Sequence, residues 1–223
     1  MKYDAIGFDV DGTLIINIDY CWDAFHERFG VAASIRQKLR HDYMMGEITY
    51  TEWGRKDVSI WRKLGISRSD FDRAISEFRL VDGAIETLRT LKKVGLKLFT
   101  ISGSLDIIVE KVLPDYATLF DYSSFARIIF NQSGVPLDFD PGHPSRLQRE
   151  DKAVELREVC NRFDVDPEKV AFVGDNDNDV PAVKAAGLGI AFCPKTPRLR
   201  NVANATITEP NLRLILPHVL GKA

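Results

Sequence analysis

Four short apolar runs are spread along the chain, each bounded by polar residues or Gly. They cover residues 3–8 (YDAIGF), 96–101 (LKLFTI), 170–173 (VAFV) and 188–192 (LGIAF). Runs of this length indicate buried strands. Helical patterns lie between them, at residues 83–94, 105–113, 151–163 and 179–186. Alternating strands and helices predict an α/β fold, a doubly wound and mostly parallel sheet covered on both faces.

Residues 15–80 follow a different pattern, because they contain helical stripes and no strand-like run. Trp22, Phe25, His26 and Phe29 recur at the i, i+3, i+4, i+7 spacing of a helix. Thr49 and Glu52 have the spacing of a capping box and predict a helix start. We therefore expect two domains: a core of residues 1–14 and 81–223, and a helical cap of residues 15–80. The aromatic stripes are expected to form the interior of the cap.

The segment 125–149 interrupts the alternation and is rich in Gly and Pro. Residues 126–130 (ARIIF) and 135–139 (VPLDF) flank Gln132-Ser133-Gly134, which predicts a two-stranded excursion. An irregular loop follows. Within it, His143 is a candidate for reaching the substrate, although a plain surface position is favoured for it, and Arg146 and Arg149 are weaker candidates for capturing an anion by the same route.

Composition excludes several classes of protein. The 223 residues include 30 Lys or Arg and 32 Asp or Glu, and a net charge of −2 argues against a nucleic-acid binder. Apolar residues are too plentiful for a disordered chain, and no run approaches the roughly 18 apolar residues of a membrane span. The N-terminus does not resemble a signal peptide. Cys21, Cys160 and Cys193 are far apart and expected to be free thiols, so a cytoplasmic location is expected.

The first run ends in an acidic motif, Asp9-Val10-Asp11-Gly12-Thr13. In an extended segment, residues two apart point the same way, so Asp9 and Asp11 are expected to face one small site. Two close carboxylates repel each other, which raises the pKa of one and favours binding of a hard divalent cation. The competing interpretation is an acidic turn in which Gly12 supplies a positive φ.

A second acidic cluster, Gly174-Asp175-Asn176-Asp177-Asn178-Asp179, follows the third run. It lacks the Gly and Glu of an EF-hand loop, which disfavours calcium binding of that type. Strand ends of a parallel sheet form one crevice, so Asp175 and Asp179 would complete an all-oxygen Mg²⁺ site with the first motif. Ser102 and Gly103 precede a predicted helix, where hydroxyl and N–H groups bind anions. Lys152 near the start of another helix would, alone, be a surface charge.

The order of these four elements resembles that of the haloacid dehalogenase superfamily, and the helical insertion resembles the cap of its phosphoserine-phosphatase-like branch. The resemblance implies a Mg²⁺-dependent phosphatase, with Asp9 as nucleophile and Asp11 as general acid and base. It assigns the cation to Asp9, the backbone carbonyl of Asp11, Asp175 and Asp179. It assigns the substrate's phosphoryl group to Thr13, Ser102, Gly103, Lys152 and Asn178.

The resemblance is weakest in the cap. Phosphoserine phosphatases hold the amino acid with an acidic residue after the first motif and an Arg in the cap, and ungapped counting places these on Ile18 and Asp57. Asp19 and Arg55 are close by, and Gly12 stands where a Ser is common. Phosphoserine or a related phosphorylated amino acid, another small phosphorylated metabolite, phosphoryl transfer to an alcohol, and noncatalytic binding of a phospholigand therefore all stay open.

Overall fold

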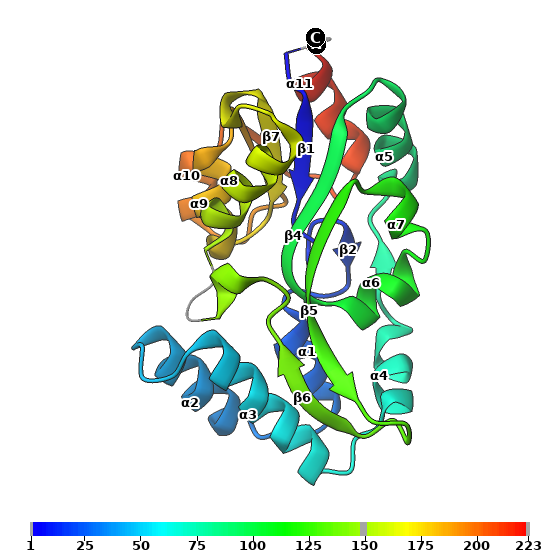
Figure 1. The fold of residues 1–223 in the computed structure, drawn as a ribbon, viewed down its shortest axis with the longest axis vertical. Helices are drawn as coiled ribbons and strands as arrows, with labels where there is room; N and C mark the ends of the chain where they lie inside the picture. The colour runs from blue at the N-terminus through cyan, green and yellow to red at the C-terminus, as the bar shows by residue number, and fades with distance from the viewer. Residues whose placement is uncertain (1, 148–150, 222–223) are drawn as a thin grey trace.

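A computed structural model of the protein describes residues 2–147 and 151–221. Its centre is a seven-stranded sheet in the order β6-β5-β4-β1-β7-β8-β9, parallel except for the edge strand β6, which is antiparallel to β5 (Figure 1). The strands are β1 (Ala5–Phe8), β4 (Lys97–Leu105), β5 (Tyr122–Phe130), β6 (Pro136–Asp140), β7 (Val170–Gly174), β8 (Leu188–Phe192) and β9 (Ala205–Ile207). The predicted α/β fold class is confirmed.

Helices cover both faces of the sheet (Figure 1). One face carries α8 (Lys152–Phe163), α9 (Val180–Ala185) and α10 (Pro197–Val202). The other carries α5 (Ala84–Lys93), α6 (Asp106–Val112), α7 (Tyr116–Leu119) and α11 (Leu216–Leu220). Alternate residues of the strands face opposite sides, so Phe99 packs in the cluster with α8 and α9 whereas Leu98 packs in the other. The uninterrupted apolar runs in the sequence arise because both faces are buried.

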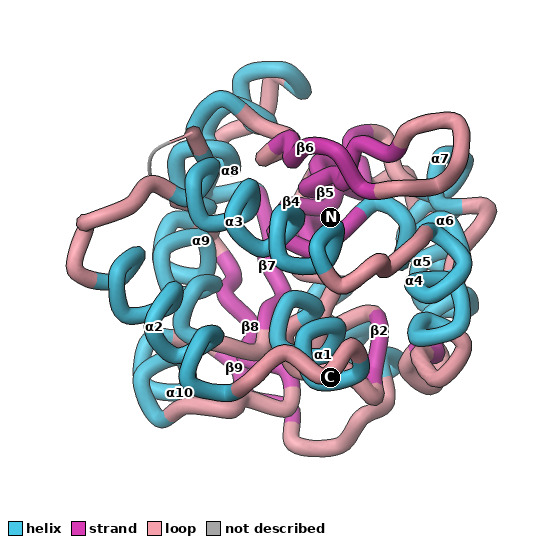
Figure 2. Tube along the Cα trace, turned by 90° about the horizontal axis from the view of Figure 1, so that it is seen from below, coloured by secondary structure: helices cyan, strands magenta, loops and turns pink. Residues whose placement is uncertain are grey.

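The helical segment after β1 contains α1 (Cys21–Arg28), α2 (Ala33–Met44), α3 (Tyr50–Lys63) and α4 (Arg68–Ile75). Two short strands, β2 (Ile15–Ile16) and β3 (Arg79–Leu80), pair antiparallel and bring its two ends together. The predicted capping box is present, since the Thr49 side chain accepts from the Glu52 N–H and the Glu52 carboxylate accepts from the Thr49 N–H. Figure 2 looks at the molecule from this side, with α1, α2 and α3 in front of the sheet.

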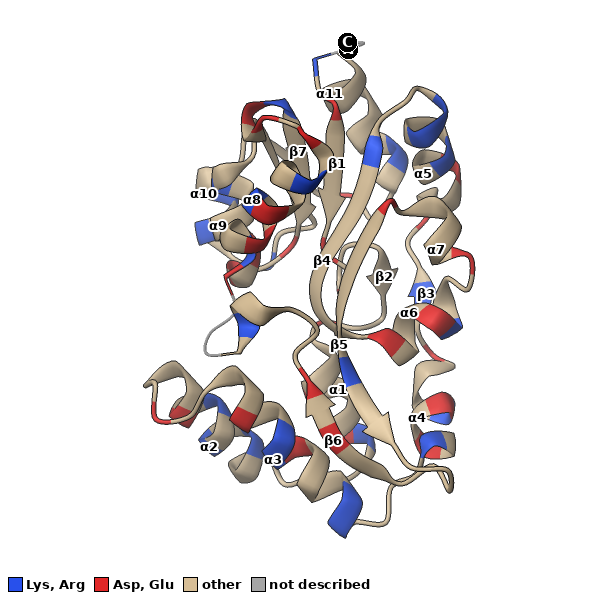
Figure 3. Ribbon diagram, viewed as in Figure 1, with Lys and Arg blue, Asp and Glu red and all other residues tan. Residues whose placement is uncertain are grey.

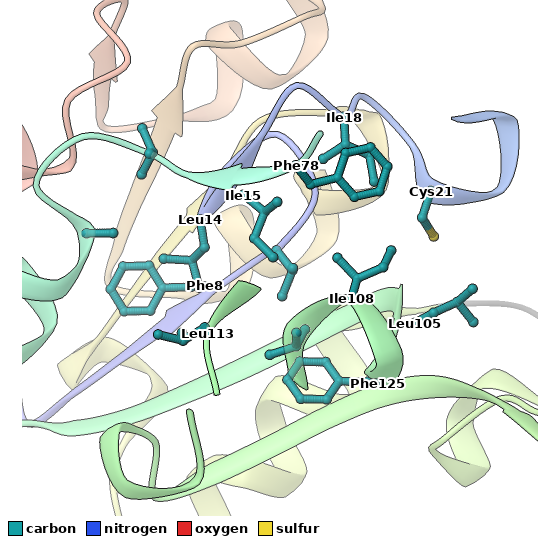
Figure 4. Packing of buried hydrophobic residues seen from close by; sticks show 14 of the residues in the cluster. Phe8, Leu14, Ile15, Ile18, Cys21, Phe78, Leu105, Ile108, Leu113 and Phe125 are labelled. Atoms are coloured by element: carbon teal, nitrogen blue, oxygen red, sulfur yellow. The ribbon is translucent and has the colours of Figure 1, made fainter. Parts of the chain in front are cut away.

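The predicted excursion is the β5–β6 hairpin, which extends beyond the rest of the sheet toward α3 (Figure 1). Phe139 of β6 packs its ring against Trp22 and Tyr50, with centroids 5.2 and 5.7 Å away. Buried side chains from this region and from the sheet form one continuous cluster. Part of it, around Phe8, Leu14 and Ile108, is drawn in Figure 4. The hairpin therefore connects the sheet to the helical segment.

The ends of several elements differ from the predicted ones. Strand β4 continues to Leu105, so the Ser102 segment lies within the strand and α6 begins one residue later, at Asp106. A 3₁₀ helix at Pro144–Arg146 (η1), strand β9 and the last two helices carry no clear sequence pattern.

Charged residues of both signs are interspersed on the helices, for example on α3 and α4 (Figure 3). Among the described residues, no helix combines the length and the apolar character needed to cross a bilayer.

Candidate active site

The carboxyl ends of three neighbouring strands, β4, β1 and β7, form one edge of the sheet. Phe8 at the end of β1 is in register with Thr100 of β4 and Val173 of β7. The residues one or two positions beyond these three therefore lie side by side. They are Asp9 after β1, Ser102 toward the end of β4 and Asp175 after β7. This is the position at which open parallel sheets bind ligands.

Three buried carboxylates gather at this edge. Asp9, Asp175 and Asp179 each offer an oxygen within 4.8 Å of the others, and all three side chains are buried. Burial, Asp179 and Asp9 raise the pKa of Asp175 to about 8, although Lys195 opposes the shift. Burial and Asp9 raise the pKa of Asp179 to about 6, against the attraction of Lys152. Such mutual repulsion favours a bound cation.

Lys152, the first residue of α8, is fully buried and joins two of these carboxylates. Its Nζ lies 2.7 Å from Asp9 Oδ1 and 2.6 Å from Asp179 Oδ1. Asp151 places the helix start, since its side chain accepts from the Ala153 and Val154 N–H groups. Residue type alone would place Lys152 on the surface, but in the structure it lies inside the acidic site.

The oxygens of the three carboxylates are not equally engaged. Asp179 Oδ2 accepts from the N–H groups of Asp175 (2.9 Å) and Asn176 (3.1 Å), which fixes the loop after β7. Asp175 Oδ1 is buried and, within residues 2–147 and 151–221, accepts no hydrogen bond. An unsatisfied buried carboxylate oxygen next to Asp9 fits a hard divalent cation with oxygen ligands.

Asp11 is held apart from this triad. Its Oδ1 accepts from Ser104 Oγ at 2.6 Å, and its Oδ2 accepts from the Cys21 N–H at 2.9 Å. Burial and the charge of Asp9 raise the pKa of Asp11, while the Ser104 and Cys21 hydrogen bonds lower it and the raising effects prevail. Asp11 therefore presents a carboxyl group suited to carrying a proton, beside a carboxylate suited to attack.

A small cavity opens above these groups. Its lining consists of Asp9, Asp11, Asp19, Tyr20, Ser102, Gly103, Ser104, Asp175, Asn176 and Asn178. Thr13 is not among them, and its fully buried hydroxyl has no hydrogen-bond partner in the described part of the chain. A larger depression of about 600 Å³ lies at the start of α5, but its Arg213 and Glu86 side chains are paired with each other.

Comparisons with known proteins agree with this geometry. The sequence matches the family of haloacid dehalogenase-like hydrolases over residues 3–187. The chain belongs to that family. It is 30% identical to the phosphoserine phosphatase of Methanocaldococcus jannaschii over 98% of both chains, and 30% identical to that of Lactococcus lactis, covering 95% of this chain and 93% of the relative. A structure described as a phospho-aspartyl intermediate analogue of phosphoserine phosphatase superposes with a TM-score of 0.76 at 30% identity, covering 98% of this chain and 100% of that chain.

The chain is thus a phosphatase of the haloacid dehalogenase-like family, in its phosphoserine phosphatase branch. Some contacts of this family member were not anticipated from its sequence. Ser104 is one, because nothing in the pattern marks it as a partner of Asp11 rather than a helix cap. Lys195 is another: its Nζ lies 2.6 Å from Asp175 Oδ2 and 3.2 Å from Asp19 Oδ1.

Gly12 makes room for the Lys195–Asp175 ion pair in this hydrolase. Its φ is +78°, and a Cβ at this position would overlap both Asp175 Oδ2 and Lys195 Nζ. Burial lowers the pKa of Lys195, but the carboxylates of Asp175 and Asp19 outweigh this effect and the pKa is raised. Lys195 is therefore a cation at the rim of the acidic site.

Two cap positions singled out in the sequence do not face the cavity. Ile18 is buried in the apolar cluster, where Figure 4 draws it beside Phe78. Asp57 Oδ1 lies 2.9 Å from His26 Nε2, and His26 Nδ1 accepts from the Trp61 indole N–H at 3.1 Å. Because Nδ1 accepts, the ring proton is assigned to Nε2.

The two nearby alternatives in the cap, Arg55 and Asp19, differ in whether they line the cavity. Arg55 is paired with Asp138 of β6, with Nε 2.9 Å from Oδ1, and does not line the cavity. Asp19 does line it. Among the candidates in the loop before α8, His143 lies 3.1 Å from Glu158 and Arg146 is fully buried, and neither lines the cavity. Arg149 lies outside the described residues.

Proposed function

We propose that the protein hydrolyses a small phosphomonoester in a Mg²⁺-dependent reaction, with Asp9 as the nucleophile. The observation that carries this proposal is the position of Asp9, buried at a strand end between Lys152 and the Asp175–Asp179 pair. A carboxylate fixed in one rotamer by a buried ammonium group is oriented for attack on phosphorus.

The reaction proceeds in two steps. An oxygen of Asp9 attacks phosphorus, the bond from phosphorus to the ester oxygen breaks, and Asp11 gives its proton to the departing alkoxide. Asp11 then accepts a proton from water as the water oxygen attacks the aspartyl-phosphate, which releases phosphate and regenerates Asp9. The Ser104 and Cys21 hydrogen bonds keep Asp11 in place for both transfers.

Asp9, Asp175 and the backbone carbonyl of Asp11 would hold the Mg²⁺ ion, with Asp179 supporting them. The ion supplies positive charge that offsets the carboxylates and the anionic phosphoryl oxygens. Ser102, Gly103 and Asn178 line the cavity from other directions and would bind the phosphoryl group together with Lys152. Thr13 stays a proposal for substrate binding, although it does not line the cavity and its N–H donates to the Val10 carbonyl at 3.2 Å.

The cap would be formed by residues 15–80, the segment closed by the β2–β3 pair, and the catalytic core by residues 1–14 and 81–223. Cap residues select the leaving group. Asp19 and Tyr20 line the cavity, whereas Arg55 and Asp57 are engaged elsewhere. This arrangement supports a small substrate with a hydroxyl or ammonium group on its alcohol. No described Lys or Arg of the cap lines the cavity, and Lys195 of the core is already paired with Asp175 and Asp19.

The proposal is tested by phosphate release from p-nitrophenyl phosphate and a panel of phosphorylated metabolites, with and without Mg²⁺. We expect release that requires Mg²⁺ and falls at least about 1,000-fold in Asp9→Asn, because the nucleophile is removed. Asp11→Asn should bind substrate and lose turnover. Equal activity of Asp9→Asn and the wild type would refute the mechanism.

The same panel of phosphorylated metabolites tests which leaving group the protein accepts. Phosphoserine and phosphoethanolamine differ by a carboxylate, and we expect kcat/KM for phosphoethanolamine to be at least as high, since Arg55 is committed to Asp138. A preference for phosphoserine of about 100-fold or more would show that a cation does bind the carboxylate. Product analysis with added alcohols separates hydrolysis from phosphoryl transfer.

A further inference from the structure

Arg146, in the loop between β6 and α8, is a fully buried arginine that the mechanism above does not use. Its guanidinium donates to Glu155 Oε2 from Nε (3.1 Å) and from Nη2 (2.7 Å). Glu155 is also fully buried and lies on α8 three residues after Lys152. This pair therefore ties the loop to the helix that carries the lysine of the active site.

The third nitrogen of the same guanidinium is bonded to the segment that lines the cavity. Arg146 Nη1 donates to the backbone carbonyl of Ser102 at 2.7 Å and to that of Pro141 at 3.3 Å. The pairing of β4 with β5 shifts between Ile101 and Leu105, so Ser102 lies inside an irregularity of the strand ladder. A strong donor at this point fixes backbone that regular sheet pairing does not.

We propose, on the basis of the proposed function, that Arg146 is a positioning residue for the phosphoryl-binding groups. One rigid guanidinium joins the Ser102–Gly103 segment to α8, and it thereby sets the distance between Ser102 and Lys152. Phosphoryl transfer depends on donors placed in advance on several sides of the phosphate, and a misplacement of about 1 Å costs on the order of 100-fold. Lys cannot replace this planar fork, because a single ammonium nitrogen does not reach both acceptors.

The test compares Arg146→Lys, Arg146→Met and the double variant Arg146→Met/Glu155→Leu with the wild type. Arg157→Lys, at an exposed position of α8, is the matched control. The Tm of every variant is measured first. Below it, calorimetry gives the Kd for inorganic phosphate in the presence of Mg²⁺, and steady-state kinetics give kcat and KM for p-nitrophenyl phosphate.

We expect Arg146→Lys to weaken phosphate binding about ten-fold and to lower kcat/KM about 10- to 100-fold, with the control unchanged. Arg146→Met leaves Glu155 as an unpaired buried charge and should lower Tm. The double variant replaces the ion pair by apolar side chains and should regain Tm. Its phosphate affinity and kcat/KM should stay low, because the Ser102 carbonyl still lacks its donor.

The inference is overturned if the double variant regains phosphate affinity and turnover together with Tm, or if Arg146→Lys binds phosphate as the wild type does. A wild-type protein that binds phosphate but hydrolyses no ester refutes the proposed function only, and the phosphate Kd values still decide the role of Arg146. A wild-type protein that neither binds phosphate nor releases it contradicts both.

Discussion

Lys152 and Arg146 lie six residues apart in the sequence, and both would be assigned to the surface from residue type alone. Both are fully buried, each opposite carboxylates that are themselves buried. The acidic motifs at the strand ends could be predicted, because Asp9, Asp11 and Asp175 lie within three residues of the end of an apolar run. Lys152 could be assigned to the site only through the family resemblance, and no pattern in the sequence marks Lys195 or the buried position of Arg146.

Asp106, the first residue of α6, allows the effect of burial on a carboxyl pKa to be tested. Burial raises its pKa to about 6, and Glu110 adds to this, while the Ile107 N–H, Arg127 and Arg68 oppose it. Between about pH 3.8 and 6 the folded protein then binds more protons than the unfolded chain, so the free energy of unfolding falls as pH rises through this window.

The Asp106→Asn variant lacks this pH dependence of the free energy of unfolding, because Asn does not titrate. The Tm difference, variant minus wild type, should therefore become more positive from about pH 4 to about pH 7, as measured by calorimetry at several pH values. The exposed Asp115→Asn is the control. A difference that stays constant over this range would show that Asp106 does not titrate as its burial requires.

At the scale of elements, α3 shows how tertiary contacts override local preference. Gly54 lies in the middle of this helix, where Ala would be favoured by about 1 kcal/mol. A Cβ at Gly54 would overlap the ring of Phe139, which is buried and held between Trp22 and Tyr50. The capping box of α3 was predictable because it is local, but the strand packed against it was not.

Gly54→Ala should consequently destabilise the protein, despite its better helix propensity. Overpacking of about 1–3 kcal/mol outweighs the propensity gain, so the free energy of unfolding should fall by about 1–2 kcal/mol in urea titrations. Lys56→Ala, at an exposed position of α3, should change it by less than about 0.5 kcal/mol. An increase in stability for Gly54→Ala would mean that β6 is not seated on the helix as described.

At the scale of the whole molecule, the sheet and the helical segment are less separate than the sequence pattern indicates. Their buried side chains form a continuous cluster, in which Phe71 of α4 packs on Phe130 of β5 at 5.6 Å. Contacts at the site also cross between them, from the Cys21 N–H to Asp11 and from Lys195 to Asp19. The alternation of strands and helices fixes the fold class, but pairing of the distant β5–β6 hairpin with α3 depends on contacts no local pattern encodes.

The proposed mechanism requires that Asp9 becomes covalently phosphorylated during turnover. The most direct measurement is acid-quenched, single-turnover reaction with p-nitrophenyl phosphate, followed by peptide mass spectrometry. Asp11→Asn is the variant of choice, because p-nitrophenolate leaves without protonation while hydrolysis of the intermediate needs the base. We predict a phosphoryl group on Asp9, present only with Mg²⁺ and absent in Asp9→Asn. Phosphate release at an undiminished rate while Asp9 stays unmodified, or while Asp9 is replaced by Asn, would contradict this mechanism.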